Sequence, residues 1–310
     1  MSTVVVERQS VTQPAPKASR RWLRQLWRDP LALISLVVLA VVLAAAIAPT
    51  WIATHSHVRP SMERLVPPST ERLMGTDQFG RDVFSRAVVA AQVSIAVGVI
   101  TVVLALAIGV PLGAVAGFYG PGPIDTTIMR IMDVMLAFPP IILAIAVIAA
   151  LGTESIEIGP FEIPHIAKLM FVIGLLYAPQ VARVVRSAVL VEKNEQYVMA
   201  ERALGASRPR ILFRDVLRNC ISPISVQATV LVANAIIAEA SLSFLGLGIQ
   251  PPQPSWGGML ADAKTYVQSG EWWLTVFPGM LIFVTVCALN VLGDYLRDVL
   301  DPREATAGAP

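Results

Sequence analysis

The chain is poor in charged residues and in cysteine. Asp, Glu, Lys and Arg together make up 15% of its 310 residues, whereas soluble domains carry about 25%. Two cysteines supply neither a disulfide framework nor a zinc site, and a net charge of +2 gives no reason to expect a nucleic-acid partner. The apolar share is high, at 55%. We therefore expect an all-α membrane protein with no room for a sizeable soluble domain.

The motifs of common catalytic and nucleotide-binding sites are missing as well. Neither a His-Glu-x-x-His nor a Gly-x-Ser-x-Gly motif occurs, and His165 stands alone, so we expect no catalytic residue. A phosphate-binding loop needs glycine directly before lysine. The four lysines follow Pro, Ala, Glu and Ala instead: Lys17, Lys168, Lys193 and Lys264. His55 and His57 make half of a metal site at most, so we expect this chain to bind no metal and no cofactor.

Long apolar runs predict six transmembrane helices. A helix needs roughly 20 mostly apolar residues to cross a hydrocarbon core about 30 Å thick. The predicted spans are Leu31–Ile52, Ser94–Gly117, Ile131–Leu151, Ile166–Val189, Ile221–Leu245 and Trp273–Leu292. Gly109, Gly113 and Gly117 recur at every fourth position of the second span, which predicts close helix packing. Pro139 and Pro140 are expected to break the third span near its start. The spacing of Arg130 and Asp133 there allows an ion pair between them.

The distribution of Lys and Arg predicts the orientation. Residues 183–218 hold eight of them, whereas the loops 152–165 and 246–271 hold only Lys264. We therefore expect both termini in the cytoplasm, although five arginines in the first outer loop run against the rule. The predicted divisions are a disordered cytoplasmic tail (1–19), an interfacial amphipathic helix (20–30), a transmembrane domain (31–303) with a first outer loop (53–93) and a cytoplasmic loop (190–219), and a C-terminal tail (304–310).

A charged island between the fourth and fifth spans, residues 192–218, has the pattern of two helices joined at a glycine. Residues 195–204 favour a helix, and Gly205 is a typical stop because glycine accepts a left-handed conformation. Pro209 suits the first turn of a second helix, which would carry a basic stripe of Arg210, Arg214 and Arg218. We call this segment the elbow. It predicts a compact handle for a separate cytosolic protein.

Polar residues on the opposite side give further candidates. Glu239 lies inside the fifth span, where a carboxyl group is expensive and is a functional candidate by default. Both a packing or outer-gate role through hydrogen bonds and contact with a substrate are open to it, and we group Glu239 with Ser241 and Ser243 as candidates for an outer gate or path. In the first outer loop, Asp77 could cap a helix that begins near Phe79.

Four stretches resemble, in order, the bacterial ABC importer permeases of the dipeptide/oligopeptide (and nickel) family, specifically the C-type subunit. They are residues 75–86, the elbow, residues 239–248 with 251–257, and residues 290–303. Three positions depart from the family pattern. The Glu-Ala-Ala triplet is replaced by Met199-Ala200-Glu201, the later Leu-Pro pair by Leu217-Arg218, and a common His by Arg72.

The resemblance implies a type I ABC importer permease in the bacterial plasma (inner) membrane. It implies that the elbow couples to an ATPase through Tyr197, Ala200, Glu201, Arg202, Ala203, Leu204, Gly205 and Ala206. It also implies an outer-loop signature formed by Gly75, Thr76, Asp77, Gly80, Arg81 and Asp82. The implied partners are membrane lipid, a second permease subunit in a heterodimer, two ATPase subunits that hold ATP and Mg, and an extracytoplasmic substrate-binding protein.

The cargo implied by the resemblance is a di- or oligopeptide, with nickel or another small ligand as the alternative. A secondary transporter is the rival class. Such proteins often show an internal repeat, and residues 1–155 and 156–310 show none.

Overall fold

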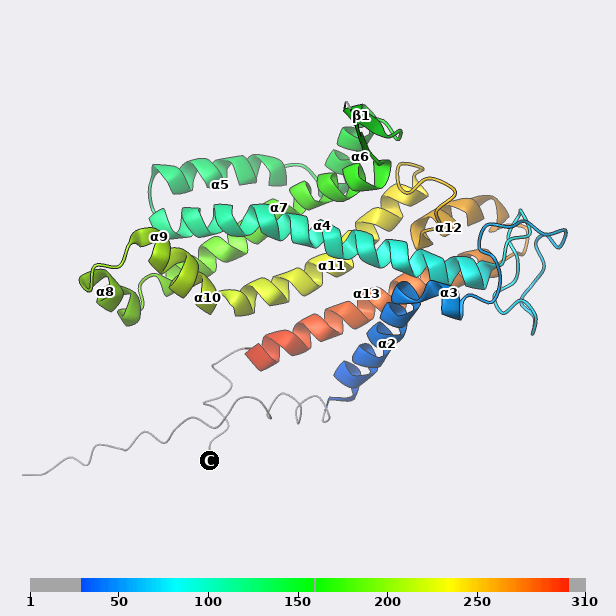
Figure 1. Ribbon diagram of the computed structural model, residues 1–310, viewed down its shortest axis with the longest axis horizontal. Helices are drawn as coiled ribbons and strands as arrows, with labels where there is room; N and C mark the ends of the chain where they lie inside the picture. The colour runs from blue at the N-terminus through cyan, green and yellow to red at the C-terminus, as the bar shows by residue number, and fades with distance from the viewer. Residues whose placement is uncertain (1–28, 159, 301–310) are drawn as a thin grey trace, which may run out of the picture.

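The computed structural model describes residues 29–158 and 160–300. The predicted tails 1–19 and 304–310, and the predicted interfacial helix up to residue 28, lie outside the described residues. Long helices dominate the structure (Figure 1). Among the described residues, five helices are long and apolar enough to cross a membrane: α2 (Pro30–Ile47), α4 (Val83–Tyr119), α7 (His165–Glu192), α11 (Ile221–Phe244) and α13 (Trp273–Leu300).

Shorter elements connect or extend these helices. They are α3 (Pro49–Ile52), α5 (Pro123–Leu136), α6 (Pro140–Leu151), α8 (Gln196–Ala203), α9 (Arg208–Arg210), the π-helix η2 (Ile211–Val216), α10 (Leu217–Asn219), α12 (Trp256–Ala263) and the 3₁₀ turn η3 (Lys264–Tyr266). Strands β1 (Ile156–Ile158) and β2 (Phe161–Ile163) form a small antiparallel hairpin in which Ile156 is paired with Ile163. Among the described residues, the regular secondary structure is therefore helical apart from this hairpin and one isolated β-bridge between Thr76 and Asp82.

The third span is broken, as predicted. Its residues divide between α5, which begins earlier at Pro123, and α6, and these helices meet at an angle of 84°. Pro139 and Pro140 lie at the break. Proline lacks the N–H of a helical hydrogen bond and disfavours a helical conformation at the residue before it, so the bend follows from this pair. The described part of the chain thus has six spans only if α5 and α6 count as one.

Helices α4 and α7 pack along each other at the centre of the fold (Figure 1). A Cβ atom on Gly109 would lie 2.6 Å from the Ala178 carbonyl oxygen, and one on Gly113 would lie 2.4 Å from the Ala182 carbonyl oxygen. A Cβ atom on Gly117 would lie 2.8 Å from the Arg186 carbonyl oxygen of α7. The predicted close packing is confirmed, because any larger residue would force the two backbones apart.

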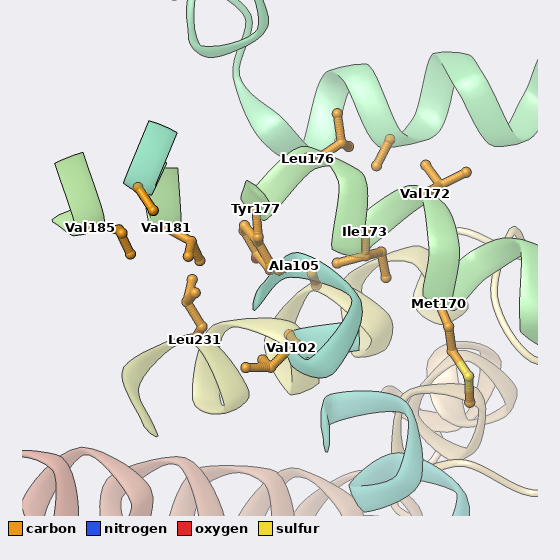
Figure 2. Close-up of a cluster of buried hydrophobic side chains, with 14 of the residues drawn as sticks. Val102, Ala105, Met170, Val172, Ile173, Leu176, Tyr177, Val181, Val185 and Leu231 are labelled. Carbon is orange, nitrogen blue, oxygen red and sulfur yellow. The ribbon is translucent and has the colours of Figure 1, made fainter. Parts of the chain in front are cut away.

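Apolar side chains complete this core. Figure 2 shows Val102 and Ala105 from α4 and Leu231 from α11 beside a row of buried α7 side chains that includes Ile173 and Val181. Both labelled α4 residues and Leu231 are almost completely inaccessible to solvent. Helices α4, α7 and α11 therefore form a single packed unit that runs between the two ends of the molecule.

Ion pairs attach α5 to α7. The Arg183 guanidinium lies 2.6 Å from the Asp133 carboxylate, and two Arg186 nitrogens donate to the two Asp125 oxygens at 2.5 and 2.7 Å. The predicted pairing of Arg130 with Asp133 is wrong, because a partner on a neighbouring helix takes the carboxylate. Local spacing could not reveal that partner, which lies 50 residues further along the chain.

Helix α4 begins at Val83, well before the predicted start of the second span at Ser94. Its N-cap is Asp82, whose carboxylate accepts the Ser85 N–H at 2.8 Å. The predicted helix cap at Asp77 is wrong: this carboxylate accepts the N–H groups of Phe79 and Arg81 within a turn. The loop that precedes α4 consequently ends at residue 82 rather than 93.

Candidate functional site

The elbow occupies one end of the long helices, and the loop before α4 lies with α12 at the other end (Figure 1). Helix α8 ends in a Schellman motif, in which the Ala206 N–H donates to the Glu201 carbonyl at 3.0 Å and the Gly205 N–H donates to the Arg202 carbonyl at 3.1 Å. Gly205 has φ of +81°, which only glycine adopts without strain. Pro209 lies in the first turn of α9. The predicted stop and restart are both confirmed.

The second helix of the elbow is less regular than predicted. It consists of α9, the π-helix η2 and α10 rather than one α-helix. In a π-helix the hydrogen bonds join residues five apart, which brings Ile211 and Val216 to the same side, and both are fully buried. The arginines of the predicted stripe are exposed: Arg210, Arg214 and Arg218.

Hydrogen bonds tie both ends of the elbow to the end of α7. The Glu192 carboxylate accepts the Tyr197 hydroxyl at 2.9 Å and the Asn219 side-chain amide at 2.7 Å. The Asn219 amide also donates to the Tyr197 oxygen at 3.1 Å. Burial and the bond to Glu192 raise the pKa of Tyr197, so its hydroxyl stays protonated and remains a donor. The elbow is thus fixed to α7 at its entry and at its exit.

One side of the elbow is buried and the other carries exposed apolar groups. Val198 from α8 and Ile211 from η2 join the main core and are inaccessible to solvent. By contrast, Leu204 is 87% exposed and Met199 57% exposed. Of the residues predicted for coupling, the exposed ones are Ala200, Arg202, Ala203, Leu204 and Gly205, and the half-buried ones are Tyr197, Glu201 and Ala206. A rigid surface with unburied apolar side chains is suited to contact another protein.

Two carboxyl groups meet on this surface. Burial and the adjacent Asp215 carboxyl raise the pKa of Glu201, against the opposing effect of Arg210 and Arg214. Sequence reasoning identified Glu201 but not this pairing, since the two residues lie on different helices of the elbow.

The residues of the outer-loop signature form a tightly packed loop at the start of α4. Thr76 and Asp82 pair as an isolated β-bridge, and the Trp273 indole donates to the Thr76 carbonyl at 3.2 Å. Both signature glycines have positive φ, and a Cβ atom would lie 2.5 Å from a carbonyl oxygen at Gly75 and 2.2 Å from one at Gly80. These contacts fix the loop to α4 and α13.

Charged side chains link this loop to α12. The Asp77 carboxylate lies 2.6 Å from Arg81 and 3.6 Å from Arg86. Both arginines also approach Asp262 of α12, at 3.7 and 3.3 Å, and burial raises the pKa of Asp262. Asp82 is 2% exposed, so its side chain positions α4 and is not available to a protein partner. Beside this group opens a cavity of about 600 Å³, lined by both arginines and Ser243.

Glu239 lies at the centre of a buried polar network. Its carboxyl group has no solvent exposure, and it accepts the Ser243 hydroxyl at 2.7 Å and the Ser94 hydroxyl at 3.5 Å. Those hydroxyls in turn accept the N–H groups of Ile249 at 3.2 Å and Trp256 at 3.3 Å. The network therefore joins α11, α4 and the start of α12.

The predicted group around Glu239 is only partly assembled. Ser243 belongs to the network, whereas the Ser241 hydroxyl donates to the Ile237 carbonyl of its own helix at 2.8 Å. Sequence reasoning missed Ser94 and Ser255, both hydrogen-bond partners of Glu239. Ser255 had a detectable signal as the N-cap of α12, where it accepts the Gly258 N–H; Ser94 had none.

The two outer-loop histidines do not complete a metal site with other side chains. Across residues 29–158 and 160–300, no three His, Cys, Asp or Glu side chains come together as metal ligands. The His55 ring lies 3.0 Å from the Thr54 hydroxyl and 4.0 Å from the Asp82 carboxylate.

Comparison with known families gives two matches. Residues 109–306 match the family described as binding-protein-dependent transport system inner membrane component. Residues 18–68 match the N-terminal transmembrane domain of oligopeptide transport permease C. Together these matches include the elbow, Glu239 and the first membrane-crossing helix.

Individual relatives agree with this assignment. A putative peptide transport system permease protein of Brucella suis is 41% identical over 286 residues, which is 92% of each chain. The dipeptide transport system permease protein of Alkalihalophilus pseudofirmus is also 41% identical over 286 residues, covering 92% of this chain and 90% of the relative. Among solved structures, the inward-facing MetNI methionine ABC transporter contains a chain with the same fold, with a TM-score of 0.54 at 21% identity over 70% of this chain and 96% of that one. The chain therefore belongs to the family of binding-protein-dependent transport system inner membrane components, the non-catalytic permeases of ABC transporters that work with a separate ATPase and a binding protein.

Proposed function

We propose that this chain is the C-type permease subunit of an ATP-driven importer for di- and oligopeptides. The observation that carries the proposal is the elbow: a rigid handle, tied to α7 through Glu192 and continuous with α11, that exposes apolar side chains. The peptide cargo is supported by relatives at 41% identity whose names refer to peptide or dipeptide transport.

The proposed assembly is a heterodimer of this chain with a second permease subunit. Two cytoplasmic ATPase subunits bind ATP and Mg, and a substrate-binding protein delivers peptide from outside. In the proposed type I arrangement the chain crosses the membrane six times, with α5 and α6 as one bent span and both termini in the cytoplasm. In support, the start of α2 and the end of α13 both point toward the end of the molecule that carries the elbow (Figure 1), where the basic residues are also concentrated.

Coupling in this proposal runs through α11. An ATPase subunit would contact exposed residues of the elbow that do not line the cavity beside it, Ala200, Ala203, Leu204 and Gly205, and move the elbow. Because α10 leads directly into α11, that movement would reach Glu239, whose hydrogen bonds join α11 to α4 and to the start of α12. Elbow and outer segment would then move together, with Glu239 as a positioning residue of the outer gate rather than a group that binds peptide.

The function is tested by reconstituting the complete transporter in vesicles with a labelled dipeptide outside. We expect uptake that requires ATP on the side of the membrane that carries the ATPase subunits. It should also require the binding protein on the opposite side, together with the dipeptide. Uptake that persists without ATPase subunits would refute the importer assignment. Cysteine labelling of Leu204→Cys from each side of the membrane tests the orientation, and labelling from outside intact cells would contradict it.

The elbow has its own test at Gly205. Proline cannot adopt φ of +81° and lacks the N–H that bonds to Arg202, so Gly205→Pro should leave ATP hydrolysis without uptake. Gly205→Asn is the matched control, because asparagine tolerates positive φ and keeps the N–H. Normal uptake by Gly205→Pro would remove the coupling role.

A further inference from the structure

A second polar cavity, of about 570 Å³, lies beside the elbow at the point where α4 and α7 both end. We call it the basic pocket. Three cationic side chains line it, together with two aromatic ones and no acidic one: Lys193, Arg202, Arg208, Phe118 and Tyr119. Such a concentration of one charge in a concave site calls for an anion.

The cations are held in place by different contacts. The Lys193 ammonium donates to the Gly117 carbonyl at 2.9 Å and also to the Gly120 carbonyl, where the end of α4 favours a positive charge. The Arg202 guanidinium lies over the Phe118 ring, 5.6 Å from its centroid. Within the described part of the chain, neither Arg202 nor Arg208 forms an ion pair with an acidic side chain. Both guanidinium groups thus keep donors for a ligand.

The positive charge of the pocket is not balanced from within the fold. Burial and the neighbouring Arg202 charge lower the pKa of Lys193, and Asp125 opposes this effect. However, both oxygens of Asp125 are already engaged by Arg186. A bound anion would relieve the repulsion between Lys193 and Arg202.

The position of the pocket favours a membrane lipid over a protein. It lies at the ends of two membrane-crossing helices, and Tyr119, an amphipathic side chain typical of the membrane surface, is 37% exposed on its wall. Ile124 and Val191, within a few residues of the pocket in sequence, are also exposed apolar groups. The most exposed apolar residue of the elbow, Leu204, does not line the pocket.

We propose that the basic pocket binds the phosphate group of an anionic phospholipid. Guanidinium groups form paired hydrogen bonds to phosphate oxygens, and basic pockets between membrane helices on the cytoplasmic side are suited to such headgroups. The lipid would bridge the end of α4, through Lys193, and the elbow, through Arg202 and Arg208.

The test uses the complete transporter in detergent, titrated in separate arms with phosphatidylglycerol, phosphatidylcholine and inorganic phosphate. Native mass spectrometry measures bound lipid, and a thermal-unfolding shift measures phosphate binding. Arg208→Gln should weaken phosphatidylglycerol binding about fivefold, the contribution of one basic residue near an anionic lipid, and Arg202→Gln with Arg208→Gln should weaken it further. The matched control is Arg218→Gln, which removes the same charge from an exposed position of the elbow outside the pocket and should change nothing.

Four results would overturn the proposal. If Arg218→Gln weakened phosphatidylglycerol binding as much as Arg208→Gln does, the attraction would be a general effect of charge and not of this pocket. If phosphatidylcholine bound as well as phosphatidylglycerol, the negative charge of the lipid would not be recognised. Equal stabilisation by inorganic phosphate would identify a site for soluble anions. Normal phosphatidylglycerol binding by Arg208→Gln would also overturn the proposal, and loss of ATPase subunits from that variant would identify a protein contact instead. If the double variant does not assemble, Arg208→Gln alone decides.

Discussion

Ser243 and Ser241 of α11 provide a paired test of the buried polar network. The same Ser→Ala change at position 243 removes the donor to Glu239 and the acceptor for the Ile249 N–H, whereas at position 241 it removes only a bond to the Ile237 carbonyl of the same helix. The two variants have identical chemistry and neighbouring positions. They differ in whether buried partners are left unpaired.

The magnitude follows from burial. Glu239 has no solvent exposure, so loss of the Ser243 hydroxyl removes a hydrogen bond from a buried carboxyl group. A buried polar group left unpaired costs about 1–3 kcal/mol, which is roughly a five- to 150-fold change in the folding equilibrium. Ser241→Ala should stay within about 0.5 kcal/mol, because serine bonded to its own helix contributes little.

The assay is denaturant unfolding of the purified transporter in detergent, combined with dipeptide uptake per ATP hydrolysed. We expect Ser243→Ala to unfold at lower denaturant and to transport less per ATP, and Ser241→Ala to match the parent in both. Equal midpoints for the two variants would refute the reasoning from burial. A lower midpoint with unchanged coupling would instead refute the role of Glu239 in linking elbow and outer segment.

Three more measurements probe other parts of the structure. Gly113→Ala should destabilise the protein by about 1–3 kcal/mol through overpacking, because its Cβ would lie 2.4 Å from the Ala182 carbonyl oxygen. Gly279→Ala, whose Cβ would meet its nearest neighbour at 4.0 Å, is the control in the same unfolding assay, and equal stability of the two would contradict the packing. Burial raises the pKa of Cys220 to about 11, so alkylation should be slow at neutral pH and accelerate up to about that pH; rapid neutral labelling would show that the thiol is accessible. Glu192→Ala removes the carboxylate that accepts hydrogen bonds from both Tyr197 and Asn219, so amide hydrogen exchange in α8 should become faster. Unchanged exchange would mean that apolar packing alone fixes the elbow.

Sequence reasoning succeeded where the signal is local. The stop at Gly205 and the restart at Pro209 depend on backbone properties of single residues, and the structure contains both. The spacing of Gly109, Gly113 and Gly117 predicted a close helix contact for the same reason, since four-residue periodicity places small residues on one face. The partner helix of that face could not be predicted from the spacing.

Two of the misses share one physical origin, which is a partner from a distant part of the chain. Arg130 was a suitable partner for Asp133 by spacing, but Arg183 on α7 takes the carboxylate. The wrong cap at Asp77 has a local cause: this carboxylate accepts the N–H groups of Phe79 and Arg81 within a turn, and Asp82 is the cap. The polar partners of Glu239 come from α4 and the start of α12, and no property of the fifth span indicates them.

The attachment of α5 to α7 by ion pairs has a consequence for membrane insertion during synthesis. Asp125 and Asp133 leave the ribosome 61 and 50 residues before their arginine partners. At 5–20 residues per second that interval is roughly 3–12 seconds, during which neither carboxylate has its ion-pair partner. Nascent α5 should therefore take its final position only together with α7.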